Sequence, residues 1–541
     1  MITVISFLFF YLLIYFLGRG LTLLLKIKLK ELYEIPINII YPIIGFFYIS
    51  NITLITNFLF KINSQFSILL LTIPLFFNFF LFEINKLKIN IKNLSLYIIT
   101  PLVLGISSSN INLAYDAGLY HLNHQKWLQT DKIIFGLSNN HMRFGYSSII
   151  EYLNVNFWLN NNFILLHFTN LIFMVVFFQI VYILLFSKHF KFAISILIYG
   201  FLDNFGFNGG KNGFIEVESI AKQDTPFAVI FIISTYFLYE LYLDKSIVPK
   251  EKLLIIFLLT IFSVELRLLG FINVVFFFIV LLYKYKFRKS LIIIFKDNFL
   301  ISLFGISFII KNLITSSCMF YPVKITCFDF LPWSTGNYSS AGAENDALVD
   351  FHIAMTNENY SYWFREWMTK EVNNTVFKNA SITFMILLFY LIFHKLKNNE
   401  NYNRSSKFLL GYCVFSLIIL IVTSPSIRFA VGIILSFVFY LSVIFESKTI
   451  NTKKYKVLLP TILYFISLGL VPQTNNYFSL IENFSKTELR SIEVPVIEYS
   501  INGSGYGVIP KSGDQCWINL ECVRNKNVTR DNYYSYTIFK K

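Results

Sequence analysis

The chain has 541 residues, of which 55% are hydrophobic, 19% aromatic and only 14% charged. A soluble globular domain carries about 25% charged residues, so polar side chains are too few here to cover a soluble globule, and 62 Phe and 33 Tyr exclude a disordered chain. The composition therefore indicates an all-α polytopic membrane protein, with a formal net charge of +15 that needs a separate explanation.

Apolar runs recur along most of the chain, and many approach the length of about twenty residues that crosses a bilayer. We predict about 11 to 14 transmembrane helices, because several runs are short enough to be re-entrant or tilted. The runs are 2–17, 36–58, 66–83, 94–106, 161–186, 190–202, 225–243, 253–264, 268–283, 298–316, 380–393, 408–423, 429–445 and 457–471.

The positive charge is concentrated in alternate connections between these runs. Seven short connections, 67 residues in all, hold 24 Lys/Arg against 5 Asp/Glu, whereas the other connections hold 20 against 22 over 224 residues. Loops rich in Lys and Arg face the cytoplasm, so the charge describes orientation in the lipid bilayer. We expect no nucleic-acid partner, since no basic cluster is interleaved with aromatics in a soluble module.

All the long connections fall on the predicted non-cytoplasmic side. We divide the chain into a multi-pass membrane domain, 1–471, with outer loops 107–160, 203–224 and 317–379, and a small extracytoplasmic C-terminal segment, 472–541. The cytoplasmic connections are too short to hold a nucleotide-binding domain, and no P-loop motif occurs. The chemistry is therefore expected in the outer loops.

Four of the five cysteines form two local pairs in these outer connections. We predict the disulfides Cys318 to Cys327 and Cys516 to Cys522, with four reduced thiols as the alternative, while Cys413 lies within a span. The excess of Lys over Arg and the abundance of Asn are typical of an AT-rich genome. Together these features favour a bacterial inner (plasma) membrane with a periplasmic or extracytoplasmic active face.

The segment from 113 to 146 holds the densest group of polar, titratable and aromatic side chains. At helical spacing Asp116, Tyr120 and Trp127 share one face, and His121 and His124 lie beside it. Ionisable groups at a membrane boundary often serve a site, although a carboxylate that opens a helix is also favoured as a cap. Both readings of the aspartate stay open.

Four stretches of the chain carry a resemblance to known proteins. They are Y-D-A-G-L-Y-H at 115–121, G-L-S-N-N-H-M-R-F-G at 136–145, S-P-S-I-R-F at 424–429 and G-D-Q-C-W at 513–517. They resemble a family of uncharacterised bacterial multi-pass membrane proteins that is itself considered similar to GT-C-type glycosyltransferases. GT-C enzymes take sugars from polyprenyl-phosphate donors on the non-cytoplasmic side, and the resemblance implies a GT-C-like fold with the loop carboxylate at Asp116.

The chemistry of such a donor needs few groups. A sugar on phosphate already has a good leaving group, so one carboxylate base that deprotonates the acceptor hydroxyl can suffice, with cations on the departing phosphate. We assign Asp116 as this base. Asp224 is a second catalytic candidate at the start of a span, where Pro226 also makes a helix N-cap a reasonable alternative.

Arginine positions are informative in a chain that uses Lys so heavily, because the planar guanidinium suits bidentate binding of phosphate. Arg143, Arg267 and Arg428 all lie at outer ends of spans or in outer loops, and Lys222 lies close to the second aspartate. For Arg267 the alternative is an ion pair with Glu265, and for Arg428 it is snorkelling to lipid headgroups.

Tyr120, His121, His124 and Trp363 complete the candidate substrate-binding set. The histidines lack metal-ligand spacing, so hydrogen bonding is favoured over acid/base or metal roles. Trp363 could stack on a sugar face, but an aromatic at an interface is also a membrane anchor. The sequence indicates no certain cofactor and leaves a divalent metal as an open alternative.

We conclude from the sequence that the chain is a GT-C-like glycosyltransferase. The expected partners are a polyprenyl-phosphate-linked sugar as donor and an envelope glycan, lipid or protein as acceptor. An O-antigen polymerase or ligase is the alternative in the same compartment and relies chiefly on arginines. A lipid-linked oligosaccharide flippase or another transporter, and a non-catalytic scaffold, are the alternatives from other classes.

Overall fold

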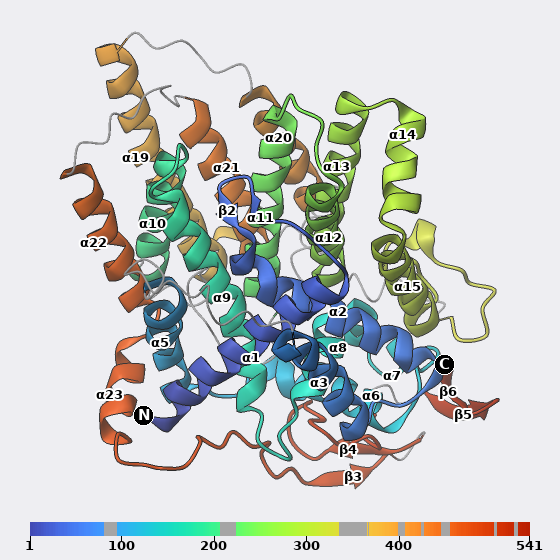
Figure 1. Ribbon diagram of the computed structural model, residues 1–541. Helices are drawn as coiled ribbons and strands as arrows, with labels where there is room; N and C mark the ends of the chain where they lie inside the picture. The colour runs from blue at the N-terminus through green and yellow to red at the C-terminus, as the bar shows by residue number, and fades with distance from the viewer. Residues whose placement is uncertain are drawn as a thin grey trace.

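A computed structural model describes residues 1–80, 95–205, 223–334, 365, 367–369, 371–398, 406–423, 427–444, 455–502, 506–523 and 528–540. Over these residues the protein is mostly helical, and its three two-stranded sheets are small. Figure 1 shows apolar helices side by side, with short helices and most of the strands gathered at the lower end of the view.

The apolar helices follow the hydrophobic runs closely. The first group comprises α1 (Ile2–Leu24), α2 (Ile37–Leu59), α3 (Ser64–Phe80), η2 (Ser95–Ile99), α5 (Thr100–Gly105), η3 (Ile106–Asn110), α9 (Ile164–Leu184), α10 (Phe190–Phe205) and α11 (Asp224–Leu243). The second group comprises α12 (Lys250–Leu266), η7 (Leu268–Gly270), α13 (Phe271–Lys284), α14 (Phe287–Ile292), η8 (Ile293–Asp297), α15 (Phe299–Ser316), α19 (Glu371–Asn398), α20 (Ser406–Thr423), η10 (Ile427–Ala430), α21 (Val431–Ile444) and α22 (Tyr455–Leu470). Each predicted run thus contains a helix, and the exceptions are a few residues at the ends of runs, such as Pro36 in β2 and residues 161–163 before α9.

The number of membrane-length helices is smaller than predicted. Within the described ranges, five helices are long and apolar enough to cross a membrane by length and composition, namely α1, α2, α9, α11 and α15. Seven other apolar helices are only 10–17 residues long, which is short of the roughly twenty residues that a span needs. A helical protein with several helices able to span a membrane is therefore confirmed, whereas 11 to 14 spans are not shown.

Helix α1 packs very closely on its neighbours because it carries small residues at the contacts. A Cβ atom on Gly18 would lie 1.8 Å from the Tyr41 carbonyl oxygen of α2, and one on Gly20 would lie 1.9 Å from the Pro74 carbonyl oxygen of α3. Small residues allow backbones to approach in this way where lipid gives no hydrophobic force between helices. The three N-terminal helices therefore form a fixed platform beside the outer segments.

Shorter elements complete the fold, and several of them lie towards the lower end of the view in Figure 1. They are η4 (Ala117–His121), α6 (Leu122–Thr130), α7 (Leu137–Asn140), η5 (Met142–Tyr146), α8 (Ile150–Asn154), η6 (Val155–Phe157), η9 (Lys324–Thr326), α23 (Thr474–Glu482) and the antiparallel strand pairs β3 (Tyr499–Ile501) with β4 (Val508–Pro510) and β5 (Thr529–Tyr533) with β6 (Tyr536–Lys540). A third hairpin, β1 (Glu31–Leu32) with β2 (Ile35–Pro36), joins α1 to α2.

Three segments that are far apart in the sequence meet at this end. The amide of Phe135 donates to the Thr537 carbonyl at 3.0 Å, and the amide of Phe539 donates back to Phe135 at 2.9 Å. The amide of Gly136 donates to the Ile314 carbonyl at the end of α15, also at 2.9 Å. The predicted outer loop 107–160 therefore lies against both α15 and the C-terminal segment.

Both predicted disulfides are present in the structure, Cys318 to Cys327 and Cys516 to Cys522, and Cys413 is a buried free thiol. The first closes the turn that follows α15, and the second closes a loop of the C-terminal segment. Each pair is local, as the spacing predicted.

Candidate functional site

The candidate site is built on the first turns that follow the α5–η3 helix. Asp116 stands at the N-terminal end of η4 and is half-buried, and its carboxylate makes no capping hydrogen bond to the helix. Asp116 thus occupies the N-cap position of η4, as the capping alternative expects, but its side chain forms no cap there. Within the described residues this carboxylate makes no hydrogen bond or ion pair, which leaves its oxygens available to a ligand.

Arg143 provides a second unpaired charge. It lies in η5, is half-buried, and has no hydrogen-bond or ion-pair partner in the part of the chain that the structure describes. Charged groups that are partly removed from water are ordinarily paired, so Asp116 and Arg143 are both unusual in the part of the chain that the structure describes.

Tyr120 lies within electrostatic range of several of the predicted charges. The residue is buried, and burial raises the pKa of its hydroxyl above the ordinary value of a tyrosine. The negative charges of Asp116 and Glu151 raise this pKa further, the positive charge of Arg143 lowers it, and Asp224 adds a smaller rise. Both predicted aspartates and one predicted arginine therefore act on the same tyrosine.

Asp224 and Arg267 form an ion pair at the same end of the molecule. Nη2 of Arg267 donates to Oδ1 of Asp224 at 2.6 Å, and the side chains are 14% and 27% exposed. The guanidinium carbon of Arg267 also lies 3.7 Å from the centre of the Phe429 ring. Gln223, and not Asp224, is the N-cap of α11, so the alternative that Asp224 is an N-cap is wrong.

Arg267 is not paired with its near neighbour Glu265, and the alternative that the two form an ion pair is wrong. Oε2 of Glu265 accepts a hydrogen bond from Nδ2 of Asn51 in α2 at 2.9 Å. The physical reason is the backbone: α12 ends at Leu266 and Arg267 is extended, with φ −159° and ψ 138°. The change from helix to extended chain lets the two side chains diverge.

His121 belongs to a buried hydrogen-bond chain behind the site. Its Nδ1 contacts Oε1 of Glu151 in α8, and both side chains are almost completely buried. The other carboxylate oxygen of Glu151 accepts from Gln125 Nε2 at 2.8 Å, and Gln125 Oε1 accepts from Trp158 Nε1 at 2.7 Å. The centre of the His121 ring also lies 4.0 Å from the centre of the Tyr120 ring. The buried hydrogen bonds that hold His121 therefore also help to hold Tyr120 in place.

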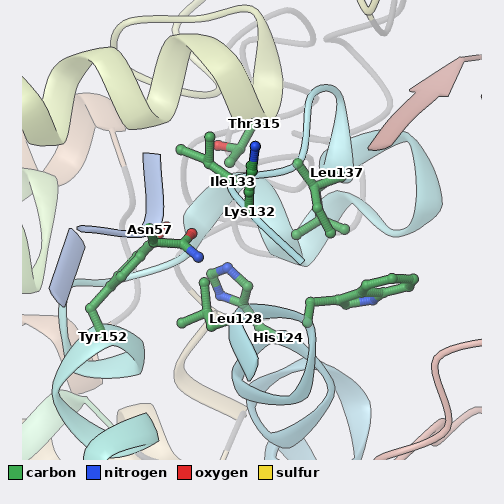
Figure 2. Close-up of a pocket in the computed structure, with 10 residues that line it drawn as sticks. Asn57, His124, Leu128, Lys132, Ile133, Leu137, Tyr152 and Thr315 are labelled. Atoms are coloured by element: carbon green, nitrogen blue, oxygen red, sulfur yellow. The ribbon is translucent and has the colours of Figure 1, made fainter. Parts of the chain in front are cut away.

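His124 lies in a small pocket on the other side of α6. Figure 2 shows its imidazole near Asn57 and Tyr152, in a pocket with about 210 Å³ of empty space. Burial lowers the pKa of His124 well below its ordinary value, and the charges of Lys311 and His121 lower it further, so the imidazole is neutral. Among the described residues, His124 Nδ1 and the Tyr152 hydroxyl have no hydrogen-bond partner.

Three of the predicted residues cannot be placed by this geometry. Lys222 and Trp363 lie outside the described residues, as does the side chain of Arg428, whose backbone belongs to η10. Within the described part of the chain, no group of three or more His, Cys, Asp or Glu side chains could hold a metal ion. The site as described therefore consists of Asp116, Tyr120, Arg143 and the Asp224–Arg267 pair.

Two contributors to this region did not come from sequence reasoning. Glu151 is fully buried, and the signal for it was a single carboxylate in the apolar stretch I-I-E-Y-L, which demands a buried partner. The loop around Trp517 contacts Gly118, two residues after Asp116. The resemblance includes both Y-D-A-G-L-Y-H at 115–121 and G-D-Q-C-W at 513–517, but it did not predict that the two stretches are in contact.

Comparison with known proteins gives one match. The model of the family described as a domain of unknown function (DUF8201) matches residues 1–435. No curated protein and no solved structure matches the chain. The matched range contains Asp116, Arg143, Asp224 and Arg267.

Proposed function

The chain belongs to the family described as a domain of unknown function (DUF8201), and we propose that it is a membrane glycosyltransferase of the GT-C type. In this proposal it transfers a sugar from a polyprenyl-phosphate-linked donor to an envelope glycan, lipid or protein on the non-cytoplasmic face of a bacterial inner membrane. The shorter apolar helices would complete a bundle of 11 to 14 spans around that face.

One observation carries the proposal. Asp116 and Arg143 are both half-buried, both lack a partner within the described residues, and both act on the buried hydroxyl of Tyr120. A general base needs a lone pair that no other group occupies, and a phosphate needs a cation that is not already neutralised. An unpaired carboxylate and an unpaired guanidinium on one tyrosine meet both requirements.

The proposed reaction divides the work between these charges. Asp116 takes the proton of an acceptor hydroxyl, whose oxygen attacks the anomeric carbon of the donor sugar. The bond from that carbon to the phosphate oxygen breaks, and the phosphate leaves with the electron pair. Arg143 stabilises the negative charge on the departing phosphate.

The Asp224–Arg267 pair has a supporting role in this scheme. The salt bridge and the Phe429 ring fix the guanidinium of Arg267 in one place, so its remaining N–H donors keep a constant direction. Asp224 thus positions an arginine for the phosphate, which fits its ion pair better than the role of a second base.

The test of this function is the substitution Asp116→Asn in cells, with lipid-linked and surface glycans compared by mass spectrometry. Loss of one sugar of defined mass is expected, because asparagine cannot accept the proton. The matched control is Asp329→Asn, an exposed aspartate that leaves the site untouched. If the glycans of the Asp116→Asn strain match those of the parent while the protein is present and folded, Asp116 is not the base.

An O-antigen polymerase or ligase is a second candidate, and the fixed arginine Arg267 with its aromatic partner Phe429 favours it. Such enzymes also act on lipid-linked glycans but depend chiefly on arginine. The two are separated by comparing Asp116→Asn with Arg143→Ala and Arg267→Ala. Greater sensitivity at the arginines than at Asp116 would favour the polymerase or ligase.

A transporter of lipid-linked oligosaccharide is the candidate from another class. Lys311 in α15 and Glu265 in α12 are both fully buried, and within the described residues neither forms an ion pair. Buried ionisable groups in membrane helices often mark a transport path. Movement of a labelled lipid-linked oligosaccharide across vesicles by the purified protein, with no glycosyl transfer, would favour this function.

A further inference from the structure

The loop from 513 to 522, which the Cys516–Cys522 disulfide closes, lies against the chain on both sides of Asp116. Nε2 of Gln515 donates to the carbonyl oxygen of Tyr115 at 2.8 Å. The amide of Trp517 donates to the carbonyl oxygen of Gly118, also at 2.8 Å. The loop therefore holds the backbone immediately before and shortly after the candidate base.

Side chains reinforce this contact. The hydroxyl of Tyr115 donates to the carboxylate of Asp514, and Nδ2 of Asn123 donates to the carbonyl oxygen of Asn519 at 2.8 Å. Contacts from the loop thus extend from the residue before Asp116 into α6. These four hydrogen bonds fix both the position and the orientation of the backbone around Asp116 relative to the loop.

Trp517 covers Gly118 so closely that only glycine fits there. A Cβ atom on Gly118 would lie 2.6 Å from the indole ring, and the indole is 6% exposed. Trp517 also has φ +49°, a left-handed conformation that costs free energy in a residue with a Cβ atom. The contacts around Trp517 must offset that free energy, so they hold the tryptophan in this conformation.

The other half of the loop is anchored to the small sheet of the C-terminal segment. The amide of Val508 in β4 donates to the Glu521 carbonyl, and the amide of Val523 donates to the Val508 carbonyl, both at 2.9 Å. The disulfide links Cys522 in this anchored half to Cys516, directly before Trp517. The disulfide therefore connects the half of the loop that is hydrogen-bonded to β4 with the half that contacts Gly118.

We propose that the 513–522 loop positions Asp116, that Gln515 and Trp517 are positioning residues for it, and that the site is complete only when the Cys516–Cys522 disulfide has formed. This inference rests on the function proposed above for Asp116. It also places a reaction before the glycosyl transfer: two cysteine thiols lose two electrons and two protons to a protein disulfide, which is reduced to two thiols. A thiol–disulfide oxidant therefore acts on this chain first.

The first test measures position and needs no substrate. The full chain in lipid nanodiscs is compared with the double variant Cys516→Ser/Cys522→Ser by hydrogen-exchange mass spectrometry of the amides from 114 to 121. We expect at least tenfold faster exchange in the variant. The matched control is Cys318→Ser/Cys327→Ser, whose disulfide lies in another loop and whose opening should leave 114–121 unchanged. Unchanged exchange in the Cys516/Cys522 variant overturns the proposal.

The second test asks whether position matters for the reaction, with the glycan mass profile as readout. Trp517→Ala should lower product at least tenfold, and Trp517→Phe, which keeps a ring over Gly118, should restore most of it. Gln515→Ala removes one hydrogen bond of an exposed loop and should lower product severalfold with unchanged thermal stability, so the test survives if the tryptophan variant does not fold. Full product from both alanine variants overturns the positioning role.

The outcomes also separate this inference from the proposed function. Unchanged glycans in Asp116→Asn with accelerated exchange in the Cys516→Ser/Cys522→Ser variant would contradict the reaction but support the positioning. Lost product in Asp116→Asn with full product in Trp517→Ala and Gln515→Ala would contradict the positioning alone.

Discussion

The guanidinium carbon of Arg267 lies 3.7 Å from the centre of the Phe429 ring, while Asp224 accepts a hydrogen bond from the same guanidinium. Three elements, α11, the end of α12 and η10, thus contribute one residue each to a fixed cation. The arrangement is polar on one side and aromatic on the other, as planar guanidinium groups prefer.

Arg267→Lys should therefore be harmful although it keeps the charge. An ammonium group cannot stack on Phe429, and the lost cation–π contact is worth about 0.5 to 2 kcal/mol. We expect product formation to fall roughly twofold to thirtyfold, since 1.4 kcal/mol corresponds to about tenfold. The glycan mass profile measures this, and Arg288→Lys, at an exposed position in α14, serves as control. Equal loss in both variants would contradict a specific role for the stacked arginine.

Glu151→Gln should weaken the fold behind Tyr120. The carboxylate of Glu151 is fully buried and contacts both His121 and Gln125, and leaving a buried hydrogen-bond partner unsatisfied typically costs about 1 to 3 kcal/mol. A clear fall in the thermal unfolding midpoint of the purified protein is expected. Glu498→Gln, an exposed position in the C-terminal segment, should leave the midpoint unchanged. A stable Glu151→Gln variant would show that the chain of hydrogen bonds is not needed.

The burial of His124 predicts a pH dependence of stability. Its folded pKa is depressed well below the value of 6.5 for a free histidine, so the unfolded chain binds the proton first as pH falls. Stability contributed by neutral His124 is present above pH 6.5 and is lost as pH falls below it, by about 1.4 kcal/mol per pH unit. Unfolding midpoints between pH 7 and pH 5 test this, with His124→Gln expected to reduce the slope. An unaltered slope in that variant would contradict the prediction.

Gly118→Ala should disturb the contact with Trp517 without touching any disulfide. A methyl group 2.6 Å from the indole ring must displace either the ring or the backbone next to Asp116, and overpacking of this kind costs about 1 to 3 kcal/mol. We expect a lower unfolding midpoint and a loss of product. Gly411→Ala in α20 is the control, because within the described residues no heavy atom outside its chain neighbours and its own helix backbone lies within 4 Å of the position its Cβ would take. If both variants behave alike, the close approach has no effect.

The helices could be predicted from the sequence because lipid-facing segments must be both apolar and internally hydrogen-bonded. All fourteen apolar runs contain helix among their described residues, with only run ends outside the helices. Their lengths could not be predicted as well, since η2 and η3 flank α5 with π and 3-10 turns that hydropathy does not reveal. The two disulfides were predictable because the cysteines of each pair are close in the sequence, and a short loop keeps its two ends near each other.

The site was predictable only in part. Asp116, Arg143 and Asp224 all influence the pKa of Tyr120, so these predicted residues lie within electrostatic range of one side chain, while their role as a site stays a prediction. The partner of Arg267 was not predictable, because the choice between Glu265 and Asp224 depends on the extended backbone that follows α12. The contacts of the 513–522 loop were equally hidden, since they join positions that only the folded chain brings together.

The contact between Gln515 and Tyr115 can form only late in synthesis of the chain. The two residues are 400 positions apart, and at about 5 to 20 residues per second a ribosome needs roughly 20 to 80 s to make the intervening chain. Throughout that interval the newly inserted helices carry Asp116 without the loop that orients it. A nascent chain halted anywhere before residue 515 would thus lack the contacts that hold the backbone on both sides of Asp116, and under the proposed function it would be inserted but inactive.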